Sequence, residues 1–398
     1  MGLVNTRFTF RMKRGMCMAQ NHLCRRAPRS EWPRSKRLDP SDRKMARPLG
    51  MKPSLVTGAN GHLGNNLCRQ LCARGERVRA MIRASADPAP LAGLDVEVVR
   101  GDIMDATATT AAVDGCGRVY HTAAGFLMWS PDPERDIIRP SVEGTRTVLE
   151  AAARAGVEKV VYTSSSGTIG HAGSPDARFD ETRTNTEPHT HYLRGKIAAE
   201  REAFAIAART GLAMTSIHPG LILGPRFWKP SESVAQIVQF VNRGAPVYFD
   251  GGFSVVDVED VARGAILAME KGRGGERYIL AGENVTVKQL FDLMAELTGL
   301  KAPAVKLPVP AVRALATVLE LASKVTGTRP MVDRSQVDEF AGKYAYFSSA
   351  KAARELGYTW LPAREVVART VAWIVERGMV TAKRQGRLHL HGAKGVAS

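Results

Sequence analysis

The sequence contains few cysteines, few aromatic residues and no long apolar run. Five cysteines occur among 398 residues, and their odd number and unpaired spacing argue against a disulfide framework and a Cys/His metal site. No run of about 18 apolar residues is present, so no transmembrane helix is predicted. The first fifty residues lack the apolar core, about 7–15 residues long, of a secretory signal. We therefore expect a cytoplasmic protein without a metal.

Acidic residues are scarce at both ends of the chain, and this scarcity explains most of the net charge of +17. Residues 1–52 contain fourteen Lys/Arg and three Asp/Glu, and residues 381–398 contain four Lys/Arg and no acid. The remaining residues, 53–380, carry a net charge of only +2. The basic residues therefore belong to two tails, 1–51 and 381–398, which we expect to be solvated. They indicate no specific nucleic-acid partner, and peripheral contact with an anionic membrane is the alternative.

The N-terminal tail has two interpretations. Residues 1–50 are rich in arginine and poor in acid, as in an organellar transit peptide. However, Met45 and Met51 stand just before the first predicted strand, and each is a candidate start. We favour an upstream extension of the reading frame, and organellar targeting is the alternative.

Between the tails, short β-rich segments alternate with helical ones. Six segments are predicted to be strands: Ser54–Thr57, Val78–Ile82, Val96–Val99, Val119–Thr122, Val160–Thr163 and Met214–His218. Amphipathic helices are predicted between them, including Leu63–Arg74 and Val142–Ala155, and a glycine follows each of these two. This alternation predicts βαβ units and an α/β class fold, a doubly wound parallel-sheet Rossmann fold.

The pattern changes after Leu223, where proline and glycine become frequent. Thr286 and Gln289 fit a capping box at the start of a helix predicted over Thr286–Leu297. We expect a dinucleotide-binding domain over residues 52–223 and a smaller, mixed α/β substrate lobe over 224–380, interleaved with the first. Open α/β sheets bind ligands outside the carboxyl ends of their strands, so such a lobe would close the ligand crevice.

A glycine-rich loop follows the first predicted strand. Gly58 permits a tight turn, Gly61 allows a pyrophosphate to approach the backbone, and Gly64 allows close packing of helix on strand. The following helix offers its N-terminal N–H groups and positive dipole end to phosphates. The loop therefore predicts a nicotinamide dinucleotide site, to which we also assign the intervening residues Asn60, His62 and Leu63.

The end of the second predicted strand favours NADP(H) over NAD(H). NAD sites usually place an acid here for the ribose hydroxyls, whereas Arg83 can pair with a 2′-phosphate. A solvated surface arginine is the alternative interpretation, and NAD(H) then stays open. Asp102 and Ile103 follow the third strand and are assigned to the adenine side, although Asp102 can equally cap the next turn.

Tyr192 and Lys196 are spaced four residues apart, which places both side chains on one helix face. A phenol with a pKa near ~10 is a poor acid–base group at neutral pH. A neighbouring ammonium, together with an oxidised nicotinamide, favours the phenolate and lowers that pKa. We therefore predict a catalytic pair, in which Lys196 also holds the nicotinamide ribose.

Three serines follow the fifth predicted strand, at its carboxyl end over the cofactor cleft. One hydroxyl there can hydrogen-bond the substrate oxygen and stabilise its developing charge. Turn serines otherwise satisfy their own backbone, and we assign that role to Ser164 and Ser166. Ser165 is predicted to be the catalytic serine.

These motifs stand in the order TGANGHLG, VYTSSSGTIG and YLRGK, and the chain resembles the extended short-chain dehydrogenase/reductase family. Within the family it is most similar to dihydroflavonol reductase-like proteins, including hopanoid-associated bacterial members. The segments VEGTRTVLEAAARAGVEKVVYTSS, LILGPR, FSVVDVEDVARGAILAMEKGRGGERYILAGEN and FSSAKAARELGY carry the similarity further, over about residues 53–380.

The resemblance implies the same roles for Ser165, Tyr192, Lys196, the three glycines and Arg83. It also implies a homodimer formed through the helix that carries Tyr192. The family commonly has asparagine where this chain has Ser141, so the water-anchoring role of that position is in doubt. His218 occupies a cofactor-side position, and we assign it to the cofactor site and not to the catalytic set.

The predicted reaction is hydride transfer between nicotinamide and a ketone or secondary alcohol, with Tyr192 exchanging the proton. The family also contains sugar-nucleotide epimerases and dehydratases and 3β-hydroxysteroid dehydrogenases, and these remain alternatives. A non-enzymatic dinucleotide sensor is the second class of function. Such proteins commonly lose the tyrosine or lysine, and this chain has both.

Apolar segments favour an apolar polycyclic substrate, such as a flavanonol, a sterol or another lipid. Residues 126–129 follow the fourth strand, and Phe227 and Trp228 follow the sixth, where they line the site or fill the interface between lobes. Residues 309–325 place Val312, Leu315, Val318, Leu319 and Ala322 at the spacing of one helix face. That segment is interpreted as core, a lid or an interfacial membrane helix, and it is too short and too charged to span a bilayer.

Overall fold

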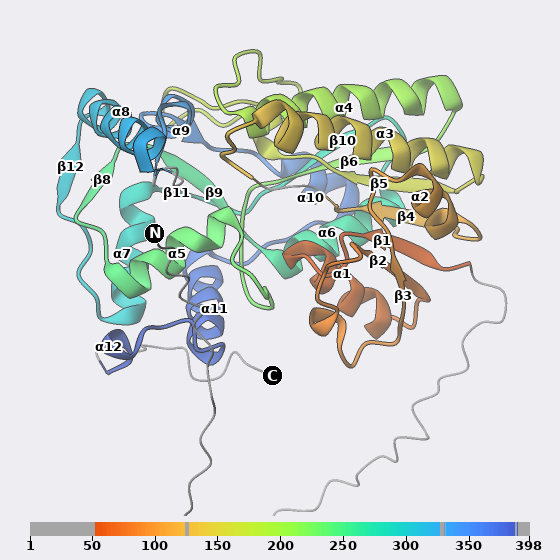
Figure 1. The fold of residues 1–398 in the computed structure, drawn as a ribbon, viewed down its shortest axis with the longest axis horizontal. Coiled ribbons are helices and arrows are strands. Elements are labelled where there is room, and N and C mark those ends of the chain that lie inside the picture. The colour runs from red at the N-terminus through yellow and green to blue at the C-terminus, as the bar shows by residue number, and fades with distance from the viewer. Residues whose placement is uncertain (1–51, 124–126, 327–329, 331, 387, 389–398) are drawn as a thin grey trace, which may run out of the picture. The chain divides into compact units, whose positions relative to one another are not determined.

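Seven parallel strands form the central sheet of the computed structural model, which describes residues 52–123, 127–326, 330, 332–386 and 388 (Figure 1). Across the sheet the strands lie in the order β10 (Arg277–Leu280), β6 (Met214–Pro219), β5 (Lys159–Thr163), β4 (Arg118–His121), β1 (Ser54–Thr57), β2 (Val78–Ile82) and β3 (Val96–Arg100). The register places Ser54 opposite Val78 on one side and Arg118 on the other. The predicted Rossmann fold is confirmed, and the strand order reverses between β1 and β4.

Helices cover both faces of this sheet, because successive side chains of a strand point to opposite faces. Val56 and Ala80 pack toward α1 (His62–Ala73), α6 (Val258–Lys271) and α10 (Ala350–Leu356). Leu55 and Val119 pack toward α2 (Ala106–Val113), α3 (Arg139–Arg154) and α4 (His191–Thr210). A π-helical turn over Glu134–Ile138 precedes α3, and short 3₁₀ turns lie at Ala89–Leu91 and Ser166–Thr168.

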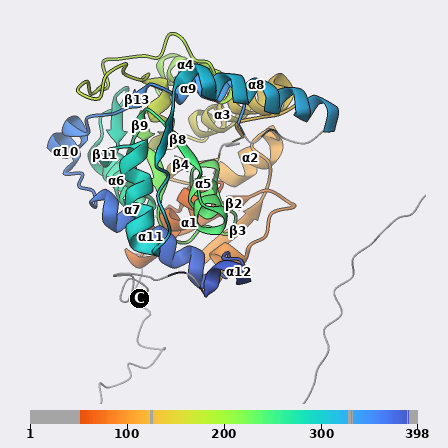
Figure 2. The ribbon, with the colours of Figure 1, turned by 90° about the vertical axis from the view of Figure 1, so that its left-hand side faces the viewer.

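The C-terminal lobe is built around a second, smaller sheet. Its strands are β11 (Glu283–Thr286), β9 (Gly252–Asp257) and β13 (Tyr344–Ala345) in that order, and β7 (Leu221–Leu223) also pairs with β9. Helices α5 (Glu232–Arg243), α7 (Val287–Thr298) and α11 (Ala363–Glu376) share one apolar core on this sheet (Figure 2). A β8–β12 pair (Val247–Phe249, Val305–Leu307) supports α8 (Val309–Thr326) and α9 (Arg334–Phe340), and α12 covers Ala382–Gln385.

Two late segments of the chain belong to the first sheet: β10 forms its edge strand, and α6 packs on one of its faces. The two lobes are therefore interleaved along the sequence. The strand β10 has no counterpart among the predicted strands. The predicted capping box is present, since Thr286 and Gln289 exchange side-chain to backbone hydrogen bonds at the start of α7. The basic extension 1–51, most of the tail 381–398 and Phe126 lie outside the described residues.

Helix α8 forms as expected, but its buried face differs from the predicted one. Val312 and Ala316 are buried, whereas Leu315 is 42% exposed and Val318 is 62% exposed. Val312 and Ala316 pack against α9. Leu315 and Val318 lie on a different face of α8 and stay exposed. None of the helices in the described part of the chain has the length and apolar character needed to cross a membrane.

We predict that Gly64→Ala destabilises the protein, because a Cβ at Gly64 would overlap the Gly58 carbonyl oxygen where α1 packs on β1. Overpacking of this kind costs about 1–3 kcal/mol of unfolding free energy. Denaturant unfolding followed by circular dichroism measures the change. Gly173→Ala is the control, because a Cβ at Gly173 meets nothing within 4 Å. Equal stability of the two variants would contradict the packing argument.

Candidate active site

The glycine loop between β1 and α1 has the geometry of a phosphate cradle. Gly58 has a φ of +66°, and a Cβ there would lie 2.8 Å from the Ala123 Cα. Gly61 stands at the N-cap of α1, and among the described residues no side chain caps this helix start. Gly64 lets the helix approach the loop. The uncapped N–H groups and the absence of Cβ atoms leave the space and the donors that a pyrophosphate requires.

The three loop residues between the glycines direct their side chains away from one another. The Asn60 amide donates to the Asp87 carbonyl oxygen at 3.4 Å. The His62 ring lies 3.0 Å from the Pro225 carbonyl oxygen and stacks edge-on against Phe227. Leu63 is buried in the core below. A cofactor would therefore meet His62 and Leu63 through their backbone, and the His62 ring instead joins α1 to the C-terminal lobe.

Arg83 is exposed at the carboxyl end of β2. The Arg100 guanidinium organises the next turn by donating to the carbonyl oxygens of Ala84 at 2.7 Å and Ala86 at 3.2 Å. No ion pair involves Arg83 within the described residues. After β3, Asp102 accepts from the Met104 backbone N–H at 2.9 Å, and the Ile103 side chain packs on Gly144 of α3. Asp102 thus caps its turn, and Ile103 belongs to the core.

The serine turn separates its three hydroxyls. Ser164 and Ser166 are buried, whereas Ser165 is only partly buried. The Ser164 hydroxyl donates to Glu200, and the Ser165 Oγ accepts from the Gly167 backbone N–H at 3.2 Å. The Ser165 side chain also acts on Tyr192, where it lowers the pKa of the phenol and partly offsets the effect of burial. Of the three serines, Ser165 is therefore the one that the structure brings to the predicted tyrosine.

Tyr192 and Lys196 lie on the first turns of α4. Thr190 caps this helix by accepting from the Leu193 N–H at 3.3 Å. The Lys196 Nζ donates to the Thr163 carbonyl oxygen at 3.1 Å, at the end of β5. Burial lowers the pKa of Lys196 to about 8, and the Glu200 charge partly opposes this shift. The ammonium is therefore held at the strand end that carries the serine turn.

The pKa of Tyr192 differs from the value expected from the sequence. Burial raises this pKa to about 12, and the hydrogen bond to Ser165 only partly offsets the rise. Lys196 is not among the causes of this shift, and its Nζ donates to the Thr163 carbonyl oxygen. The prediction concerned the ammonium together with an oxidised nicotinamide. In the protein alone, desolvation of the phenolate is the larger effect and the pKa rises.

The predicted catalytic residues and the glycine loop lie at the same edge of the sheet. His121, at the end of β4, lies 2.8 Å from the Thr57 Oγ1 through its Nδ1, and Thr57 precedes Gly58. Burial lowers the pKa of His121 to about 3, and the Lys196 charge lowers it further. Lys196 is therefore close to the strand that leads into the loop. The reversal of strand order between β1 and β4 places this edge where α/β sheets bind dinucleotides.

Two buried residues near the serine turn have roles that sequence reasoning missed. His218 was expected on the cofactor side, but its side chain is 0% exposed and its Nδ1 lies 3.1 Å from the Ser165 carbonyl oxygen. It therefore supports the turn from below. Glu200 accepts from Ser164 and Thr168 and had not been predicted. Its position four residues after Lys196 is the signal that would have found it.

Ser141 does not reproduce an asparagine. Its hydroxyl donates to the Ile137 carbonyl oxygen at 2.7 Å within its own helical segment. A Cβ at Gly195 would lie 3.3 Å from the Ser141 Oγ, so the residue packs beside the catalytic helix. Its one hydroxyl is thus engaged in a local hydrogen bond.

The apolar residues expected at the mouth of the site lie mostly in the core. Met128 is buried, and Leu127 and Trp129 are partly buried. Phe227 is fully buried, and its carbonyl oxygen accepts from the Trp373 indole at 2.9 Å. The Arg377 guanidinium lies 4.1 Å from the centre of the Trp228 ring. Phe227 therefore fills the interface between lobes, which was the alternative interpretation.

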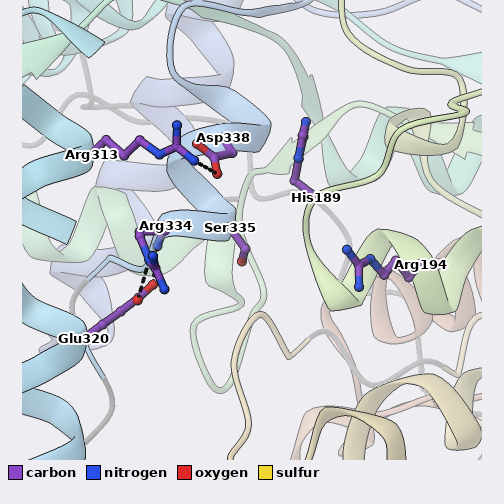
Figure 3. Close-up of a pocket in the computed structure, with 7 residues that line it drawn as sticks. All are labelled: His189, Arg194, Arg313, Glu320, Arg334, Ser335 and Asp338. Atoms are coloured by element: carbon purple, nitrogen blue, oxygen red, sulfur yellow. Dashed lines mark hydrogen bonds and ion pairs between the residues drawn. The ribbon is translucent and has the colours of Figure 1, made fainter. Parts of the chain in front are cut away.

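A cavity of about 310 Å³ lies beside the start of α4 (Figure 3). All of its lining residues are polar: His189, Arg194, Arg313, Glu320, Arg334, Ser335 and Asp338. Two ion pairs stand in its wall, Arg313–Asp338 at 3.2 Å and Arg334–Glu320 at 2.8 Å. This cavity suits a polar group and not an apolar ring system.

Known sequences agree with this geometry. The pattern of the NAD-dependent epimerase/dehydratase family matches residues 54–281, from β1 through β10. The chain belongs to this family. It is accordingly an NAD(P)-dependent enzyme of the oxidoreductase type, and the family's extended short-chain dehydrogenase/reductase character confirms the resemblance seen in the sequence.

Individual family members cover most of the chain. It is 37% identical over 338 residues to "Sterol demethylase protein B" of Methylococcus capsulatus, with 82% of this chain and 99% of that protein aligned. It is 33% identical over 330 residues to "Putative dihydroflavonol 4-reductase" of Synechocystis, covering 82% and 95%. The solved structure of MoeE5 in complex with UDP-glucuronic acid and NAD is similar, with a TM-score of 0.64, 26% identity, and 82% and 99% coverage.

We predict that His62 makes the protein sensitive to acid. Burial lowers the pKa of His62 to about 4, whereas an unfolded histidine titrates near ~6.5. As the pH falls from 6.5 toward 4, the unfolded state binds the proton first, so the stability that is complete above pH 6.5 is progressively lost.

His62→Gln keeps an amide donor near the Pro225 carbonyl and removes the titration. Between pH 7 and pH 5 we expect the wild type to lose about 2 kcal/mol more unfolding free energy than the variant. Chemical denaturation at both pH values measures this, and each protein at pH 7 serves as its own reference. Parallel losses in the two proteins would show that His62 is not the titrating group.

Proposed function

We propose that the protein is an NADPH-preferring oxidoreductase that interconverts a ketone and a secondary alcohol, with Ser165, Tyr192 and Lys196 as its catalytic residues. The observation that carries this proposal is the gathering of three side chains at the carboxyl end of β5: Ser165 acts on the Tyr192 phenol and lowers its pKa, and Lys196, one helical turn after Tyr192, donates to the Thr163 carbonyl oxygen at 3.1 Å. A phenol and a serine hydroxyl so placed can bind one substrate oxygen from two sides.

The glycine loop and Lys196 fit a nicotinamide dinucleotide, with Gly58, Gly61 and Gly64 at its phosphates and Arg83 at a 2′-phosphate. When bound, this cofactor supplies or accepts the hydride. Ser165 donates to the substrate oxygen and stabilises its charge. Tyr192 gives its phenolic proton to that oxygen in the reducing direction and takes it back in the oxidising one. The buried ammonium of Lys196 would orient the ribose of the bound dinucleotide.

The substrate class is supported by the relatives. One similar protein is named for sterol demethylation and another for dihydroflavonol reduction, and both names refer to polycyclic compounds. An apolar polycyclic ketone is therefore the substrate class that we propose. A sugar nucleotide is the second candidate, because the similar MoeE5 structure holds UDP-glucuronic acid and the cavity beside α4 is polar.

Tyr192→Phe is expected to reduce kcat by about 10²- to 10⁴-fold, because the ring remains and the proton donor is lost. Steady-state kinetics with a ketone substrate measure the change, and NADPH titration should give an unchanged Kd. Tyr248→Phe, in β8 of the C-terminal lobe, is the matched control and should retain full activity. Wild-type turnover by Tyr192→Phe would remove the basis of the proposed mechanism.

Arg83→Ala is expected to weaken NADPH binding by roughly 10- to 100-fold and to leave NADH binding unchanged, because only NADPH carries the 2′-phosphate. Fluorescence titration with each dinucleotide measures both constants. Arg201→Ala removes an exposed arginine of α4 and should change neither. Equal effects on the two dinucleotides would refute the assignment of Arg83.

A further inference from the structure

A buried carboxylate lies directly beneath the serine turn. Glu200 is on α4, one turn beyond Lys196, so Tyr192, Lys196 and Glu200 follow each other at four-residue intervals. Its Oε2 accepts from the Ser164 hydroxyl and from the Thr168 Oγ1, the latter at 2.8 Å. A single oxygen atom thus binds side chains on both sides of Ser165 in the sequence.

The backbone of Ser165 is fixed by the same cluster. Its carbonyl oxygen accepts from the Thr168 backbone N–H at 3.1 Å and from the His218 Nδ1 at 3.1 Å, because the single Thr168 hydroxyl proton is donated to Glu200. A carbonyl cannot donate, so the Nδ1 carries the proton, and the Nε2 accepts from the Ser216 hydroxyl at 3.0 Å. Ser164 and Thr168, on either side of Ser165, and the Ser165 carbonyl oxygen are all held in place. Only the Ser165 side chain is therefore left to contact Tyr192.

The other carboxylate oxygen is compensated electrostatically. The Glu200 Oε1 lies 3.0 Å from the Arg277 Nη2 of β10 and 3.8 Å from the His218 Nε2. Burial by itself would raise the pKa of Glu200, but the Arg277 charge and the two hydroxyl donors oppose this rise. Burial lowers the pKa of His218 to about 4, so at neutral pH the ring is neutral and Arg277 is the counter-charge.

We propose that Glu200 is a positioning residue, which acts through Ser164 and Thr168 to hold the Ser165 hydroxyl against the Tyr192 phenol. The consequence for catalysis rests on the proposed function, whereas the geometry does not. A buried ionised acceptor holds hydroxyl donors more firmly than a neutral one, because charge-assisted hydrogen bonds are stronger. The Glu200 carboxylate thereby sets the distance between α4 and the serine turn.

The test uses the full chain with 3-fluorotyrosine placed at position 192, so that the ¹⁹F resonance reports the hydrogen bond of the phenol without turnover. Ser165→Ala defines the resonance of the broken bond. Glu200→Gln is expected to move the resonance at least half of the way to that position. Glu202→Gln, on the outer face of the same helix and paired with Arg146, should leave it in place.

A second variant keeps the proposal testable if Glu200→Gln does not fold, because that change also removes the counter-charge of Arg277. Ser164→Ala combined with Thr168→Val leaves the carboxylate and removes both hydroxyl links. It should move the resonance in the same direction. Glu200→Asp retains the charge on a shorter side chain, so its resonance should lie between those of the wild type and Glu200→Gln.

Kinetics separate this proposal from the proposed function. If both hold, Glu200→Gln lowers kcat by up to about 100-fold with little change in the KM for NADPH, since a misplaced hydroxyl affects the reacting oxygen and not the dinucleotide. A wild-type resonance in Glu200→Gln and in the double variant, with only a lower Tm, would overturn the positioning role. If the resonance shifts in Glu200→Gln but Tyr192→Phe is fully active, Glu200 positions Ser165 and the proposed mechanism is wrong.

Discussion

Helix α4 packs with one buried face along the sheet, its first turns reach the carboxyl end of β5, and the geometry of the site depends on this packing. The face is apolar at Ala203 and Ile206 and polar at Lys196 and Glu200. Gly195 allows the helix to approach α3, because any Cβ there would lie within 3.4 Å of the Ile137–Ile138 backbone. The core packing of Ala203 and Ile206 thus also places Lys196 and Glu200, which lie earlier in the same helix, near the strand ends.

Burial imposes an electrostatic cost that the surrounding groups offset. Desolvation raises the pKa of Tyr192 to about 12 and lowers that of Lys196 to about 8, so both shifts favour the neutral forms. The Ser165 hydrogen bond opposes the first shift, and the Glu200 charge opposes the second. The C-terminal lobe contributes as well, because Glu339 of α9 accepts from the backbone N–H groups of His189 and Thr190 at the start of α4. The lobe therefore anchors the helix that carries the proposed catalytic pair.

Features set by local sequence were predictable. The strands β1 and β2 have the expected bounds, and the capping box of α7 follows from two residues three positions apart. The glycine loop and the YxxxK spacing are equally local. Features set by distant contacts were not predictable from periodicity. The strand β10 is short and joins the sheet from a late segment, and Phe227 is buried because His62 and Trp373, far from it in sequence, pack around it.

The same distinction holds within the site. Single residues such as Ser165 and Tyr192 could be chosen from motifs, but the partners of His218 and Glu200 come from two strands, β6 and β10, and from the serine turn. Burial places His218 beneath the serine turn, and desolvation of Tyr192 itself raises its pKa. Such effects depend on which groups are removed from water together, and a sequence pattern does not contain that information.

The most direct measurement is the nicotinamide absorbance of the purified protein mixed with NADPH or NADH and a panel of flavanonols, sterol ketones and sugar nucleotides, with product analysis of each mixture. We predict net oxidation of NADPH with an apolar polycyclic ketone and formation of the matching alcohol, more slowly with NADH. Conversion of a sugar nucleotide to its epimer without net consumption of either dinucleotide would contradict this account and assign the same residues to an epimerase.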